Sequence, residues 1–220
     1  MVSTAPQNVY TAARNRPAWL GPGAMAGVPM ALSPFRCQIR LSLSDLDRQI
    51  FAQRTVAIAQ FPDEPDEHIL LRFLAQVLCF EETLQDKSGW FDVHEPDLLA
   101  LDLTGTPTHW IECGAPPLKR LVRAMGHLKS ARFVVLFADP SDCDAFCRAL
   151  VAERPRNLDR IELCEIPKEF MAWLESIGHR NMDWSATLAD GTLYLDCAGQ
   201  HGDCVPIWRR IDVNGRPAVA

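Results

Sequence analysis

The chain has 220 residues, of which 48% are hydrophobic and 23% charged, and its formal net charge is −6. This length and apolar content are enough for one sizeable globular core. No uninterrupted apolar run of ~18 residues occurs, so we expect no membrane-spanning segment. The negative charge argues against a broad, non-specific grip on nucleic acid, although a local basic site remains compatible with it.

Residues 1–29 differ in composition from the rest of the chain. They are rich in Ala, Pro and Gly and show no hydrophobic periodicity. Their prolines and glycines interrupt the continuous apolar region that a signal peptide needs. We therefore expect a disordered leader over residues 1–29 and a folded domain over residues 30–220.

The eight cysteines include no CxxC pair, and several of them lie inside apolar runs. A thiol in such a run behaves as a small hydrophobic side chain. Disulfides are rare in reducing compartments, so this usage is typical of reduced thiols in a cytoplasmic protein.

Strand and helix patterns alternate along the folded part. Apolar and polar side chains alternate over residues 35–45, which predicts a strand with one buried face, and residues 48–62 form its hairpin partner. The remaining predicted elements are a helix over 63–80, two strands within 95–114, a helix over 116–130, a strand over 131–139, a helix over 141–153, a strand over 160–166, a helix over 167–178 and a hairpin over 183–197. This order predicts one α/β domain with a central mixed sheet flanked by helices.

Three carboxylates fall at positions that this pattern predicts to be buried. Asp97 opens one strand and heads an apolar row, and Glu112 lies inside the apolar run of the next strand. Glu67 falls on the same side of the first predicted helix as Leu70 and Leu74. Burying an unpaired carboxylate costs several kcal/mol, so the three acids need a cation, a basic partner or protons. Magnesium prefers oxygen ligands, and we expect Glu67, Asp97 and Glu112 to bind it.

Basic residues follow directly in the sequence. No acid occurs between Glu112 and Asp139, whereas the next predicted helix carries Lys119, Arg120 and Arg123. A basic helix beside a metal site could hold a phosphate.

Structural alternatives stay open at each of these positions. Asp97 could simply end a turn, and Glu67 could serve the helix dipole. Glu112 could form a buried salt bridge with Lys119 or Arg123. The basic residues could also form an ordinary solvated face of the helix.

Residues 45–78, 95–116 and 119–124 together resemble the YaeQ family of bacterial proteins. The resemblance extends over about residues 30–196, and the family is similar to a divergent branch of the PD-(D/E)xK nuclease superfamily. It implies a restriction-endonuclease-like core, with one acid at the start of a strand and an acid, one spacer and a lysine on the next. Asp97 and Glu112 match the acids, whereas Gly114 stands at the lysine position.

The resemblance also implies roles for these residues. Asp97 and Glu112 would bind magnesium, with Glu67 as a further ligand, and Lys119 would orient the attacking water or stabilise developing charge. Arg120 and Arg123 would hold backbone phosphates of a nucleic acid. The expected function is therefore a magnesium-dependent nuclease. The alternatives are a catalytically degenerate binding or regulatory module with the same fold, and a cytoplasmic interaction protein whose acids are structural.

Overall fold

The computed structural model describes residues 34–87, 95–178, 180–211 and 217–219, and the predicted leader over residues 1–29 lies outside these ranges. Within them the chain forms four α-helices and twelve β-strands in a mixed α/β arrangement. In these ranges no helix combines the length and the hydropathy of a membrane-spanning segment.

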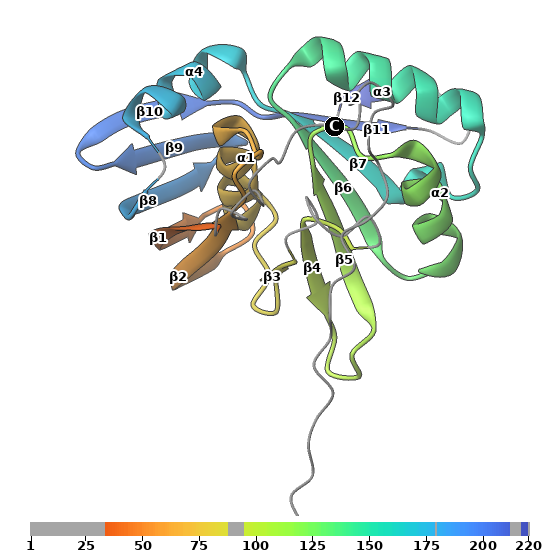
Figure 1. Ribbon diagram of the computed structural model, residues 1–220, viewed down its shortest axis with the longest axis horizontal. Helices are drawn as coiled ribbons and strands as arrows, with labels where there is room; N and C mark the ends of the chain where they lie inside the picture. Colours follow the sequence, from red (N-terminus) through yellow and green to blue (C-terminus); the bar gives the residue numbers. More distant parts are fainter. Residues whose placement is uncertain (1–33, 88–94, 179, 212–216, 220) are drawn as a thin grey trace, which may run out of the picture. The chain divides into compact units, whose positions relative to one another are not determined.

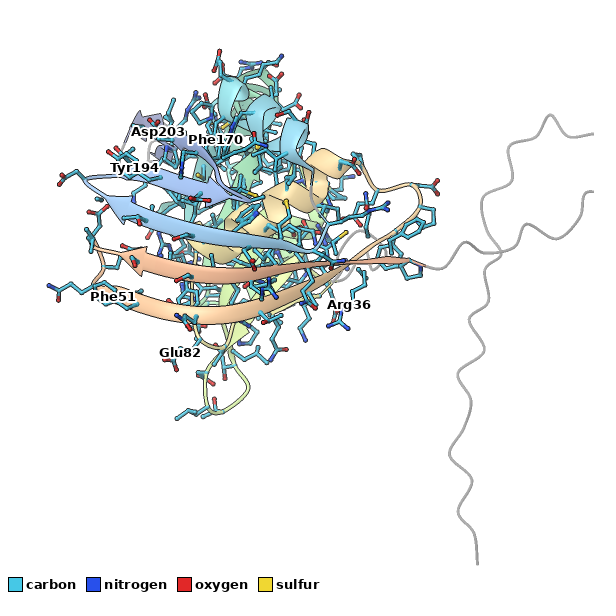
Figure 2. All side chains as sticks on the ribbon, turned by 90° about the vertical axis from the view of Figure 1, so that its left-hand side faces the viewer. Arg36, Phe51, Glu82, Phe170, Tyr194 and Asp203 are labelled. Atoms are coloured by element: carbon cyan, nitrogen blue, oxygen red, sulfur yellow. The ribbon has the colours of Figure 1, made fainter. Side chains whose placement is uncertain are left out.

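The first sheet has the strand order β10-β9-β8-β1-β2 (Figure 1). Its strands are β1 (Phe35–Asp45), β2 (Ile50–Gln60), β8 (Met182–Ala189), β9 (Thr192–Cys197) and β10 (Gln200–Cys204). β1 runs antiparallel to β2 and parallel to β8. Side chains of a strand alternate between its two faces, so Ile39 and Leu41 are buried while Arg40 and Ser42 are exposed. Figure 2 looks onto this exposed face.

The second sheet has the order β12-β11-β7-β6-β5-β4-β3. Its strands are β3 (Gln85–Asp86), β4 (Leu98–Leu101), β5 (Pro107–Cys113), β6 (Arg132–Phe137), β7 (Ile161–Glu165), β11 (Ile207–Ile211) and β12 (Pro217–Val219). The central strands β5, β6 and β7 are parallel, and the outer pairs are antiparallel. Phe133 and Val134 of β6 are both buried although they face opposite sides, because both faces of this sheet are covered.

The helices divide between these faces. α1 (Asp66–Leu78) and α4 (Lys168–Ile177) contribute to the core that the two sheets share. α2 (Leu118–His127) and α3 (Pro140–Glu153) pack on the opposite face of the second sheet. The layers are therefore the first sheet, α1 with α4, the second sheet, and α2 with α3 (Figure 1).

The expectation of one central sheet is wrong, because the strands form two mixed sheets. The β1–β2 hairpin pairs with β8, far away in the sequence, rather than with β4 or β5. Periodicity shows which face of a strand is buried but does not name the neighbouring strand. The predicted helices and the longer strands are confirmed, whereas the short strands β3, β10, β11 and β12 were not predicted.

Candidate functional site

Glu112 lies near the end of β5 and is 2% exposed. Its Oε1 accepts a hydrogen bond of 2.7 Å from Trp110 Nε1, and its Oε2 accepts one of 2.6 Å from Arg120 Nη2 of α2. Burial raises the pKa of Glu112 to about 7; the Arg120 cation opposes this rise and the charge of Asp97 adds to it. Arg120 is therefore the basic partner of Glu112, in place of Lys119 or Arg123.

Asp97 immediately precedes β4 and is 4% exposed. Its Oδ2 accepts a hydrogen bond of 2.7 Å from the Cys113 backbone N–H. The same oxygen lies 3.4 Å from Nε2 of His68 on α1. The hydrogen bond from the Cys113 backbone and the nearby His68 ring thus compensate for the burial of this carboxylate.

His68 links Asp97 to a buried polar network that the apolar periodicity of the sequence does not predict. Its Nδ1 lies 2.6 Å from Glu64 Oε1, which also accepts a hydrogen bond of 2.7 Å from Arg72 Nη1. Arg72 in turn forms an ion pair with Asp86. Glu64 lies two residues before α1, and His68 and Arg72 follow at intervals of four residues, so that the two lie on one side of the helix. That spacing is the signal by which the network could have been predicted.

The network sets the charge of its members. Burial by itself lowers the pKa of His68, but hydrogen bonds and charge interactions with Asp97 and Glu64 overcome this effect and raise it to about 9. Burial likewise works to raise the pKa of Glu64, and the bonds from His68 and Arg72 bring it below its usual value. His68 is therefore an imidazolium at neutral pH, held between two carboxylates.

The structure places Asp97 and Glu112 at neighbouring positions of adjacent strands. The antiparallel register pairs Leu98 of β4 with Ile111 of β5, so Asp97 and Glu112 occupy the next pair of opposite positions along the two strands. Their partners nevertheless come from opposite sides of the sheet, because α1 supplies His68 and α2 supplies Arg120.

Glu67 has different surroundings. It is exposed in the first turn of α1. Partial burial raises its pKa, and the acids Glu175, Asp142 and Asp139 of α4 and the start of α3 raise it further. Glu67 therefore belongs to an acidic surface, and the buried acid that approaches Asp97 through His68 is Glu64.

The carboxylates do not present an arrangement fitted to a metal ion. Across the described ranges, no three Asp, Glu, His or Cys side chains are grouped so that they could hold one. Asp97 Oδ2 already accepts a hydrogen bond from the Cys113 backbone N–H, and the two Glu112 oxygens accept hydrogen bonds from Trp110 and Arg120.

Basic side chains line an open pocket of about 500 Å³ beside Glu112. Its lining residues are Trp110, Lys119, Arg120, Arg123, Ala124, His127 and Leu128. Lys119 and Arg123 are exposed, and neither forms an ion pair within the part of the chain that the structure describes. The first turn of α2 also contains no acid. The pocket can therefore attract an anion without first breaking a salt bridge of Lys119 or Arg123.

Gly114 lies between β5 and α2, at the position where the nuclease pattern has its lysine. Its φ angle is +77°. Side chains other than glycine rarely adopt this left-handed backbone conformation. The local backbone therefore disfavours a lysine at this position.

Comparison with known proteins identifies one family. The family model described as "YaeQ protein" matches residues 30–205. The chain is 28% identical over 175 residues to a Salmonella typhi relative named "Uncharacterized protein YaeQ", covering 77% of this chain and 92% of the relative. It is 27% identical over 172 residues to the relative from Escherichia coli K12, covering 76% of this chain and 90% of the relative.

Two solved structures share the fold. The crystal structure of YaeQ from Xanthomonas axonopodis pv. citri superposes with a TM-score of 0.71 at 24% identity, covering 81% of this chain and 99% of that one. The structure of YaeQ from Pseudomonas syringae also gives a TM-score of 0.71 at 24% identity, covering 80% and 95% of the two chains.

Proposed function

The chain belongs to the YaeQ family, and from this premise we propose that it is a nucleic-acid-binding module with a restriction-endonuclease-like core that no longer depends on metal chemistry. The core is supported by the order of its parts. An acid, Asp97, precedes β4, a second acid, Glu112, lies on the adjacent β5, and the basic helix α2 follows. This order matches the nuclease pattern except at Gly114.

The observation that carries the proposal is the contrast between the acids and the bases of the site. Asp97 and Glu112 are buried and already engaged by protein donors. Lys119 and Arg123 are exposed and stand beside the Trp110 side chain in the same pocket. Cations bind backbone phosphates, whereas Trp110 is only 8% exposed and forms part of the pocket wall. The site is therefore built to bind a polyanion rather than to cleave it.

Fluorescence anisotropy with labelled single-stranded and duplex oligonucleotides tests this proposal. The double variant Lys119→Ala/Arg123→Ala should weaken binding at least tenfold at moderate salt. It should also reduce the slope of log K against log salt by about 2, since two phosphate contacts are lost. The matched control is Arg148→Ala/Arg156→Ala, which removes the same charge from exposed positions outside the pocket. Equal affinities for the two double variants would refute the site.

A magnesium-dependent phosphodiesterase is the second candidate. It is favoured by the mutual repulsion of Asp97 and Glu112, which contributes to the raised pKa of Glu112 and which a divalent cation would relieve. Cleavage of linear and branched substrates with magnesium or manganese tests it. Wild type must cleave, and the variants Glu112→Gln and Asp97→Asn must not. Absence of cleavage together with retained binding would leave the binding module as the better account.

A cytoplasmic location is part of the same proposal. It is supported by the eight cysteines, all of which are free and buried. Disulfides form readily in oxidising compartments, whereas reduced thiols are usual in the cytoplasm.

A further inference from the structure

The edge strand β2 differs from the other sheet edges that the structure describes. β3 has 2 residues and β12 has 3. β10 has 5 residues and carries His201 and Asp203 on its surface. β2 has 11 residues. A long edge strand is a template for pairing with another strand, and soluble proteins usually protect such edges.

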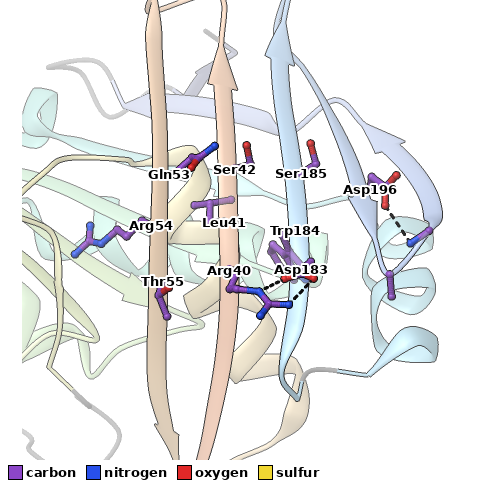
Figure 3. A pocket seen from close by; sticks show the side chains of 12 residues that line it. Arg40, Leu41, Ser42, Gln53, Arg54, Thr55, Asp183, Trp184, Ser185 and Asp196 are labelled. Atoms are coloured by element: carbon purple, nitrogen blue, oxygen red, sulfur yellow. Dashed lines mark hydrogen bonds and ion pairs between the residues drawn. The ribbon is translucent and has the colours of Figure 1, made fainter.

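β2 carries few of the usual protective features. Its eleven residues pair with β1 without a bulge, and it contains no proline and no lysine. Its one charged side chain, Arg54, belongs to the less exposed, even-numbered face of the strand and extends past β2 on the side away from β1 (Figure 3). There its guanidinium donates to the carbonyl oxygens of Glu81 and Leu84. On the outer side, Phe51 is 69% exposed at one end of the strand (Figure 2).

The odd-numbered residues of β2 direct their backbone groups to the free edge. The backbone N–H of Leu46 donates to Leu188 O. The backbone N–H and C=O groups of even-numbered residues at this end of β1 therefore point toward β8, and those of odd-numbered residues point toward β2. Asp45 is paired with Ile50, so the even-numbered residues of β2 face β1. Arg72 Nη1 of α1 donates to Ala59 O at this edge, which agrees with this orientation and shows that the Ala59 carbonyl already has one donor.

We propose that β2 pairs antiparallel with β2 of a second copy of the chain, about a two-fold axis at Thr55. The two five-stranded sheets then form one continuous sheet. Such an interface uses the same patch on both subunits and closes after two copies. Backbone hydrogen bonds supply the attraction, as in other cases of strand addition.

The side chains of β2 are self-complementary in this register. On the outer face Thr55 lies opposite Thr55 of the partner subunit, a pair that is favourable across strands. The large Phe51 lies opposite the small Ala59 of the partner subunit. On the inner face Arg54 lies opposite the partner's Val56. A register shifted by one residue, centred on Arg54, would place the two arginines opposite each other, which is unfavourable. This self-complementarity favours a second copy over an unrelated extended segment.

Analytical ultracentrifugation of the full chain tests the proposal. Wild type should sediment as a dimer at about 100 µM, since even a weak interface of micromolar affinity would be saturated there. Thr55→Lys and Thr55→Glu should each sediment as monomers, because each places like charges opposite one another. An equimolar mixture of the two variants should again form dimers, because Lys and Glu then face each other.

The matched control is Ser42→Lys. Ser42 is exposed on the same face of the neighbouring strand β1, directly opposite Gln53, but away from the edge. This variant should remain dimeric. A monomeric wild type, a dimeric Thr55→Lys variant or a mixture that stays monomeric would each overturn the proposal. The mixing experiment also separates loss of pairing from misfolding, since a misfolded variant would not recover a partner.

Discussion

Replacing His68 by glutamine tests the charge that the structure assigns to the network beneath Asp97. Both ring nitrogens of His68 face carboxylates, with Nδ1 at 2.6 Å from Glu64 and Nε2 at 3.4 Å from Asp97. A neutral imidazole carries one N–H and can donate to only one of them, whereas an imidazolium can donate to both. The protonated form is therefore favoured in the folded state.

The contribution of the protonated His68 to stability follows from its pKa. It rises from 6.5 to about 9 on folding, and one pKa unit corresponds to 1.36 kcal/mol, so the protonated ring contributes about 3 kcal/mol to the free energy of unfolding. The folded state binds the proton more tightly than the unfolded state. The contribution is therefore fully present below pH 6.5 and is lost as the pH rises through about 9.

Urea unfolding of wild type and His68→Gln at several pH values measures this contribution. The difference in the free energy of unfolding between the two proteins should be largest near pH 6 and should shrink by about 3 kcal/mol by pH 10. The direct check is the ¹H–¹⁵N spectrum of the imidazole, which reports its protonation. A difference that is independent of pH, or a neutral ring at pH 7, would refute the assignment.

Three further predictions concern single positions. Arg120→Met leaves Glu112 buried without its cation, so urea unfolding should show a loss of about 2–3 kcal/mol at pH 8 that diminishes at pH 5, where Glu112 is protonated. Gly114→Ala should lower stability by about 1 kcal/mol because of its positive φ, whereas Gly126→Ala inside α2 should raise it by about 0.5 kcal/mol; thermal melting compares the two. Glu162 has a lowered pKa between Arg132 and Arg210, so Glu162→Gln should destabilise the protein at neutral pH, and this deficit should disappear in acid titrations below the folded pKa of Glu162.

The candidate site could be predicted from the sequence only in part. The prediction that Asp97 and Glu112 are buried is confirmed. It was possible because each acid interrupts an apolar strand pattern at a position that the pattern predicts to be buried. The partners of these acids could not be predicted, since they come from α1 and α2 and depend on how the helices pack. Glu67 was grouped with the buried acids by helical periodicity, but periodicity fails at the first turn, where α1 emerges into solvent.

Local sequence patterns were enough to predict the helices, the longer strands and the buried faces of those strands. Apolar spacing and turn residues are local signals, and one-sided alternation in β1 distinguishes it from β6, whose residues after Arg132 are all apolar. Long-range packing sets three further features: the strands divide into two sheets, Arg120 rather than Lys119 pairs with Glu112, and β2 lies at the edge of its sheet. These outcomes depend on contacts between residues far apart in the chain, and no local pattern encodes which distant segment will supply a strand's neighbour or a carboxylate's cation.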